Sequence, residues 1–157
     1  IMTSFYGVNN TKAYQNVPAE KIPAGEQAGR LRVAYDKISL SETIVGDVLH
    51  MMKIPKGARV LDVIVKFVDL DTGNTDARMD IGWAASSDAV ESADDNGFFD
   101  ALDISAAGCK GMVANAAHVP GHMKKFTAEC EVQIIPGGGT SDVSSGDIEL
   151  MLVYVMD

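Results

Sequence analysis

The acidic stretch DLDTGNTDARMD, residues 69 to 80, is the first candidate for chemistry, because carboxylates bind calcium. Asp69, Asp71 and Asp80 fall at positions 1, 3 and 12 of a calcium-binding loop. An EF-hand loop also requires Gly at position 6 and a bidentate Glu at position 12, but here those positions hold Asn74 and Asp80. Gly73 and Asn74 both tolerate positive φ, so the pattern predicts a hairpin turn without a metal ion.

The histidines are the next candidates. His118 and His122 in HVPGH stand four residues apart, a spacing that binds zinc when it lies on a helix. Pro120 and Gly121 preclude a regular helix there, and the glutamate of the HExxH zinc motif is absent. His50 has no nucleophile or second acid at a recognisable spacing, so we expect a hydrogen-bonded, half-buried histidine rather than a catalytic base.

Thiol and phosphate chemistry have little support. Cys109 and Cys130 form no CxxC pair and have no companion histidine at zinc-finger distance, which predicts two free thiols. The Gly-rich run at residues 136 to 146 lacks the lysine and the following helix of a phosphate-binding loop. We therefore expect no catalytic residues, no metal and no cofactor, and predict that the protein is not an enzyme.

A second acidic stretch runs from Asp80 to Asp103. Seven acids and no base lie between Arg78 and Lys110. Asp94 and Asp95 could act as an acid/base pair, but adjacent residues on a turn seldom converge on one substrate atom. The stretch therefore predicts a solvated loop that binds no metal.

The overall charge limits the possible partners. The formal net charge is −9, which argues against nucleic-acid binding because that depends on clustered Lys and Arg. No apolar run approaches the roughly 18 to 20 residues of a membrane span, and the opening residues lack the charged-then-apolar order of a signal peptide. We expect a protein that binds neither nucleic acid nor membrane and that takes no small-molecule substrate.

The elements that must position these residues are strands. The organising segment is Ile54 to Asp69, in which a Pro-Lys-Gly turn is followed by apolar side chains on both faces, as in a central strand. One of its faces carries Leu61, Val63, Val65 and Phe67. Alternating patterns predict further strands at residues 30–40, 44–54, 78–83, 125–135 and 148–156.

Two of these patterns carry specific expectations. In the first strand Leu31, Val33 and Tyr35 alternate with Arg32, Ala34 and Asp36, which predicts a half-buried strand. In the strand at 78–83, Trp83 is the only tryptophan and is expected to anchor the core. About seven strands and no helix beyond one or two turns predict an all-β fold, an antiparallel β-sandwich of jelly-roll-like type.

The two ends of the chain are the candidate contact regions. Residues 1–29 have no regular period and are read as an extended N-terminal arm, followed by a β-sandwich domain at 30–157. The arm's candidate docking residues, onto another protein or a neighbouring protomer, are Phe5, Tyr6, Lys12, Tyr14 and Lys21. The last strand is apolar on both faces, which implies a central sheet position or a subunit interface through Leu150, Leu152 and Tyr154.

Several segments together resemble the head-decoration, or capsid cement, proteins of tailed phages. They are RVAYDKISL, IPKGARVLDVIVKF, DIGWA and FFDALDISAAG, in this order, and the final strand. The resemblance implies a β-sandwich, usually trimeric, that binds the major capsid protein on the outer surface of the virion. It carries no catalytic residues.

Three other functions share parts of this pattern. A carbohydrate- or receptor-binding module of the virion would have the same sandwich, with exposed aromatic residues around an acidic loop. A tail or head-completion protein would form a ring of another symmetry. A cupin-type enzyme would need His and Glu clustered on neighbouring strands, which three scattered histidines do not supply. Fold alone does not separate these functions.

Overall fold

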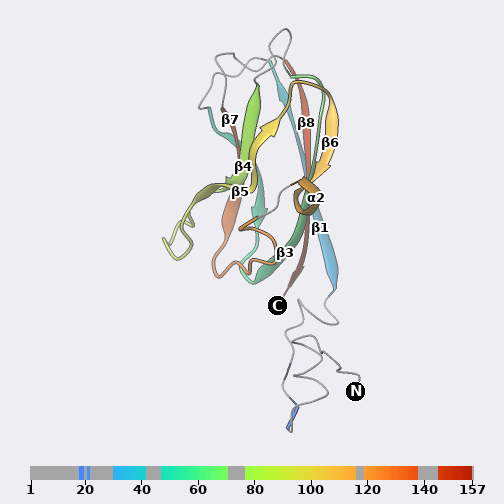
Figure 1. Ribbon diagram of the computed structural model, residues 1–157. Coiled ribbons are helices and arrows are strands. Elements are labelled where there is room, and N and C mark those ends of the chain that lie inside the picture. The colour runs from blue at the N-terminus through green and yellow to red at the C-terminus, as the bar shows by residue number, and fades with distance from the viewer. Residues whose placement is uncertain are drawn as a thin grey trace, which may run out of the picture.

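The computed structural model describes residues 18, 19, 21, 30–41, 47–70, 77–115, 119–137 and 145–156. Within them the chain forms eight strands and one short helix (Figure 1). In chain order these are β1 (Leu31–Leu40), β2 (Leu49–Ile54), β3 (Ala58–Phe67), β4 (Arg78–Trp83), β5 (Asp94–Asp103), β6 (Gly108–Gly111), α2 (Met112–Asn115), β7 (Cys130–Gly137) and β8 (Gly146–Met156). The arrangement is nearly all β, as the alternating patterns predicted.

The strands form two four-stranded sheets, in the orders β1-β8-β3-β6 and β2-β7-β4-β5. Every pairing between neighbouring strands is antiparallel. Figure 1 shows the sheets packed face to face, with the loop between β4 and β5 projecting from one side. Two antiparallel sheets that share eight strands in this order form a jelly-roll sandwich. The predicted fold class is confirmed.

The core lies between the sheets and contains an aromatic cluster. The ring centre of Trp83 lies 5.0 Å from that of Phe98 and 5.1 Å from that of Phe126. The indole N–H of Trp83 donates a hydrogen bond of 3.0 Å to the backbone oxygen of Ser92. Trp83 is therefore the predicted core anchor, and it also holds the base of the projecting loop.

Strand β3 is central, between β8 and β6, as predicted. The prediction for its inner face was correct for Val63, Val65 and Phe67 but wrong for Leu61, which is half-buried. The register against β8 shifts between Val60 and Asp62, so the residue between them leaves the alternation. Leu61 is the extra residue of this bulge, so the side chain of Val60, rather than that of Leu61, faces the core.

Strand β1 is half-buried, but its buried face differs from the one that the pattern favoured. Leu31, Val33 and Tyr35 face solvent, whereas Ala34 and Ile38 pack on the core. Ile38 and Leu40 share the parity of Ala34, and burying them fixes which face turns inward. The larger apolar residues at the start of the strand are left outside.

A solvated loop was predicted between Asp80 and Asp103; residues 84–93 do form a loop, but strand β5 takes up the second part of the stretch. Asp95, Asp100 and Asp103 are exposed, as expected, but Glu91 in the same stretch is buried, and the expectation of a loop was wrong for residues 94–103. The register against β4 shifts twice, and Ala101 has a positive φ of 49°. These bulges interrupt the alternation that identifies a strand in sequence.

Candidate functional site

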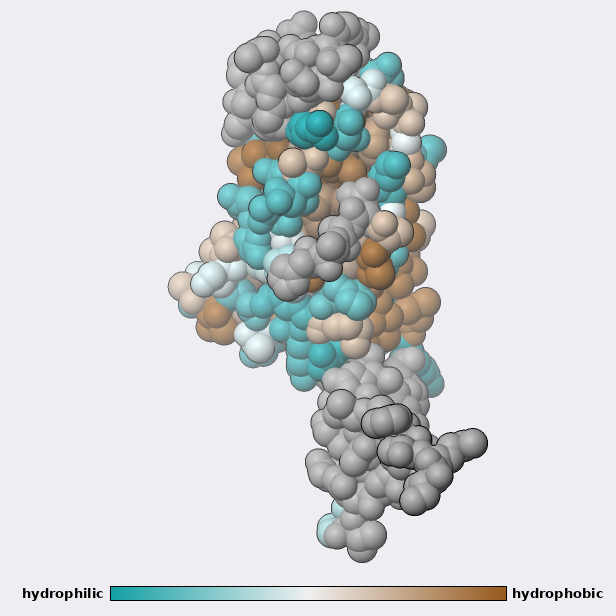
Figure 2. Space-filling model, in the orientation of Figure 1, coloured by the Kyte–Doolittle hydropathy of each residue, from teal (hydrophilic) through white to brown (hydrophobic). Residues whose placement is uncertain are grey.

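The outer surface of the sheet β1-β8-β3-β6 carries a contiguous apolar face. Tyr35 of β1 lies opposite Met151 of β8, which lies opposite Ile64 of β3. Val33 and Val153 form the next pair along the same two strands. We call the set Leu31, Val33, Tyr35, Ile64, Met151 and Val153 the outer apolar face. Figure 2 shows brown, hydrophobic surface over β1.

Four of these six side chains, those of Leu31, Val33, Tyr35 and Met151, are exposed although they are large and apolar. Leu31 is 63% exposed, and Val33 and Tyr35 are each 55% exposed. Isolated exposed apolar residues are common on soluble proteins, but a contiguous group often marks a surface that binds another molecule. The outer apolar face is therefore the leading candidate for a contact surface.

A small pit of about 130 Å³ opens within this face. Its lining includes the apolar groups of Tyr35, Ile64, Cys109 and Met151 and the charged side chains of Lys66 and Glu149. The Glu149 carboxylate accepts hydrogen bonds of 2.8 Å from Lys66 Nζ and 3.0 Å from the Tyr35 hydroxyl. The Lys66 ammonium and the Tyr35 hydroxyl hold the pKa of Glu149 below its ordinary value. The pit combines apolar lining groups with a charged, hydrogen-bonded pair.

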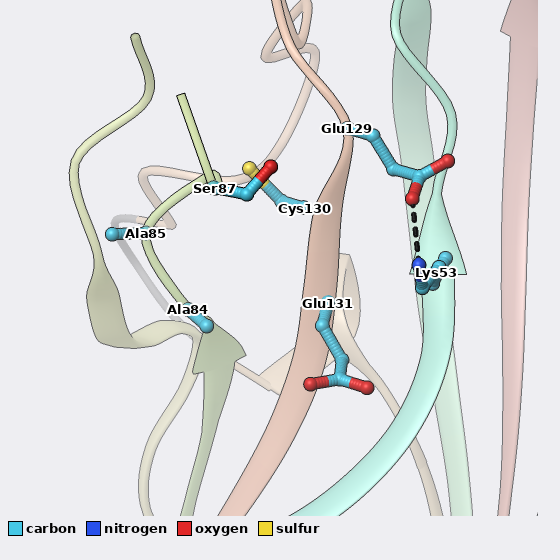
Figure 3. Close-up of a pocket in the computed structure, with 7 residues that line it drawn as sticks. All are labelled: Lys53, Ala84, Ala85, Ser87, Glu129, Cys130 and Glu131. Carbon is cyan, nitrogen blue, oxygen red and sulfur yellow. Dashed lines mark hydrogen bonds and ion pairs between the residues drawn. The ribbon is translucent and has the colours of Figure 1, made fainter. Parts of the chain in front are cut away.

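A polar groove of about 290 Å³ lies on the other sheet, between the loop after β4 and strands β2 and β7. Figure 3 shows Lys53 and Glu129 pointing toward one another on one side of β7, and the distance between their charged atoms is 2.8 Å. The neighbouring Glu131 accepts a contact of 2.8 Å from the exposed ring of His50. The charged groups that line this groove are thus already paired within the protein.

The groove shows no arrangement for nucleophilic catalysis among its lining residues. Cys130 lines it, but burial raises the pKa of the thiol, so the unreactive protonated form is favoured. Ser87, the other candidate nucleophile, shares the groove with carboxylates and Lys53 but with no histidine lining it.

The projecting loop between β4 and β5 is fastened by one buried carboxylate. Glu91 is only 8% exposed, and it accepts hydrogen bonds of 2.7 Å from both the N–H and the hydroxyl of Thr127. Lys124 Nζ lies 2.9 Å from the same carboxylate and 5.5 Å from the ring centre of Trp83. Burial alone would raise the pKa of Glu91, but these donors outweigh it and lower the pKa.

The described part of the chain does not bring together the side chains of a metal site. There, no three His, Cys, Asp or Glu side chains gather closely enough to hold a metal ion. Asp80 instead accepts a 2.7 Å hydrogen bond from the N–H of Ala101 in the bulge of β5. The helix that the structure describes is far too short to cross a membrane.

The predicted contact residues are placed as follows. Of the arm residues, Lys21 is exposed, while Phe5, Tyr6, Lys12 and Tyr14 lie outside the described residues. Asp71, the Gly73-Asn74 turn and His118, which were considered for other roles, also lie outside them. Leu150 and Leu152 are fully buried in the core of the chain itself, and the half-buried Tyr154 packs against that core. Strand β8 occupies a central sheet position, which was one of its two predicted explanations, and a subunit interface there stays a prediction.

Sequence reasoning missed two features. The outer apolar face could have been found from the parity of Ile38 and Leu40, which reverses the faces of β1. No local spacing could have found the anchor of Glu91, because Lys124 and Thr127 are 33 and 36 residues away in sequence.

No family model and no curated protein matches the chain. Solved structures do. A chain in the capsid of Ralstonia phage GP4 matches with a TM-score of 0.66 and 21% identity, over 95% of this chain and 96% of that one. A chain in the capsid asymmetric unit of cyanophage Pam1 matches with a TM-score of 0.63 and 21% identity, over 90% and 96%. One in the acid-stable capsid of Helicobacter pylori bacteriophage KHP30 matches with a TM-score of 0.50 and 14% identity, over 80% and 87%.

These likenesses extend over most of both chains, so they concern the whole sandwich rather than one motif. At such low sequence identity they establish a shared fold. The chain has the jelly-roll fold of chains found in the capsids of three phages.

Proposed function

We propose that this chain is a structural protein of a tailed-phage virion, which binds the major capsid protein on the outer surface of the head as a homotrimer and stabilises the head. The observation that carries the proposal is the match over 95% of the chain to a protein in the capsid of Ralstonia phage GP4. The match covers 96% of that chain too, so the two are alike in extent as well as in fold.

Charge favours the outer surface over the inner one. The net charge of −9 would be repelled by packaged DNA, whose phosphates attract Lys and Arg. A protein on the outside of the head meets no such penalty. The same charge supports protein contacts rather than nucleic-acid contacts for this chain.

The surface supports binding rather than catalysis as the activity. The most distinctive feature of the described surface is an apolar face, and burying apolar area is how stable protein contacts gain free energy. A carbohydrate-binding role is less well supported, because Trp83, Phe98 and Phe126 are buried and cannot stack on a sugar ring. In this proposal, residues 1–29 fasten the protein to the head or to a neighbouring protomer.

Binding to phage heads tests the proposal. Heads of the phage that encodes the chain are prepared without it, and purified protein is added in increasing amounts before sedimentation. We expect saturable binding in multiples of three copies and a higher temperature for DNA release. Heads of an unrelated phage serve as the control. Binding confined to the head–tail junction, binding to host cells alone, or no binding to the heads would contradict it.

A further inference from the structure

The outer apolar face has no partner within the described part of the chain. Over all the described residues, eight large apolar side chains are exposed. Four of the eight, Leu31, Val33, Tyr35 and Met151, belong to this one face. The face also continues into the pit beside Ile64. If copies of the protein associate, this is where the exposed apolar area is concentrated.

The pit indicates what kind of group it accepts. Its volume of about 130 Å³ is close to that of the roughly 150 Å³ apolar cavities that bind one benzene ring. Tyr35 and Lys66 donate to Glu149 beside the pit, and the ammonium and carboxylate keep further hydrogen-bonding positions for an adjoining backbone or hydroxyl group. The pit therefore suits one aromatic side chain with polar groups next to it.

We propose that residues 1–29 of one copy lie across the outer apolar face of a neighbouring copy and insert one aromatic ring into its pit. This rests on the proposed homotrimer and names the surface that holds it together. The segment contains three aromatic residues, Phe5, Tyr6 and Tyr14. Its charges, Lys12 and Lys21 against Glu20 and Glu26, cancel, so it can approach a chain of net charge −9 without repulsion.

The segment is long enough for this contact. Twenty-nine residues reach at most roughly 100 Å when extended. The face spans about 13 Å along β1 from Leu31 to Tyr35, and about 10 Å across three neighbouring strands. Only a part of the segment is needed to cover the face, and the remainder can cross to the next copy.

The attachment point of the segment allows it to reach the outer apolar face of a neighbouring copy. It joins the sandwich at Arg30, next to Leu31, where the outer apolar face begins. Donor segment and acceptor face therefore lie at the same edge of each copy. Copies arranged around a threefold axis can each give a segment to the next and receive one from the previous, and the ring closes with every face filled.

Photocrosslinking in the full-length protein tests the contact directly. Benzoylphenylalanine replaces Tyr6 or Tyr14, and light and heavy isotope-labelled copies are mixed at about 100 µM, refolded together and irradiated. We expect crosslinks to peptides from residues 31–35, 62–66 or 149–153, with light–heavy pairs present. Crosslinks confined to the other sheet, or pairs formed only within single copies, would refute the proposal.

Cys109 gives an independent readout, because it is exposed in one copy and lines the pit. In the assembled protein we expect the neighbour's segment to slow its reaction with a maleimide. Val33→Lys should restore fast labelling and weaken association at least about tenfold, since a charge replaces a buried apolar group. Val90→Lys is the matched control, because Val90 is 59% exposed on the projecting loop. The buried Cys130 should stay unlabelled in each case.

The outcomes separate this inference from the proposed function. A trimer whose Cys109 reacts equally fast with and without Val33→Lys refutes the docking of the segment, while head binding can still stand. A protein that stays monomeric at 100 µM also refutes it. Failure of the wild-type protein to bind heads refutes the proposed function, whatever the crosslinks show.

Discussion

Replacing Glu91 by glutamine should destabilise the fold more than any comparable change at a surface ion pair. The carboxylate is buried and accepts from three donors, two on Thr127 and one on Lys124. The amide of glutamine keeps one oxygen that can accept from Thr127. It loses the ion pair with Lys124 and turns an N–H₂ group toward the ammonium or toward Thr127.

The expected loss follows from the burial of the two partners. Hydrogen bonds to charged groups contribute about 1.5–3 kcal/mol each. Breaking a fully buried pair costs about 3–5 kcal/mol, but the Lys124 side chain is 27% exposed and can regain water, so the upper range does not apply. We expect Glu91→Gln to lower the free energy of unfolding by about 2 kcal/mol. For a chain of this size that lowers the Tm by about 4–8 °C.

Urea titration and calorimetry measure this loss, and Glu129→Gln is the matched control. Glu129 lies 2.8 Å from Lys53, but their side chains are 56% and 66% exposed, so its loss should cost less than about 1 kcal/mol. A double-mutant cycle with Lys124→Met should give a coupling energy of about 1 kcal/mol or more between the two partners. Equal stability of the Glu91 and Glu129 variants would show that the buried carboxylate does not anchor the loop.

Three further predictions concern the same sandwich. The pKa of Glu91 is lower in the folded protein than in the unfolded chain, so its ionised carboxylate stabilises the fold fully above the ordinary glutamate pKa of about 4.3. This stabilisation is lost as the pH falls through the folded pKa. The urea midpoint of the wild type should therefore drop at that pH, and the midpoint of Glu91→Gln should drop less. Ala101→Gly should raise the Tm by a few degrees, because glycine adopts the φ of 49° without the cost of about 1–2 kcal/mol that alanine incurs, and a lower Tm would contradict this. Gly97→Ala should lower the free energy of unfolding by about 1–3 kcal/mol, since the added Cβ would lie 2.1 Å from the Trp83 ring; an unchanged urea midpoint would exclude that contact.

The sequence was most informative where one face of a strand is covered throughout. In β7 and the residues before it, Phe126, Cys130, Val132 and Ile134 are all buried, as their alternation predicted. In β5 two register shifts and outward-facing acids hid the strand, because a bulge changes the period on which the prediction depends. Alternation therefore identifies regular strands and fails at bulged ones.

The candidate contact surface was harder to predict than the fold. Its pit draws Tyr35, Ile64, Cys109 and Met151 from four strands that are far apart in the chain. Which residues meet depends on strand order and register, and alternation within one strand specifies neither. The pattern at the start of β1 also predicted the wrong buried face. Ile38 and Leu40, further along the strand, lie at the parity of the face that is in fact buried.

The four edge strands of the sandwich differ in how well they resist pairing with another chain. Strand β6 has only four residues, β2 is bulged between His50 and Lys53, and β5 is acidic with two register shifts. Short, charged or bulged edges are the usual defences against an added strand. Strand β1 has ten residues and pairs with β8 without a shift. A regular edge beside an exposed apolar face is where a segment from another copy can gain both backbone hydrogen bonds and buried area.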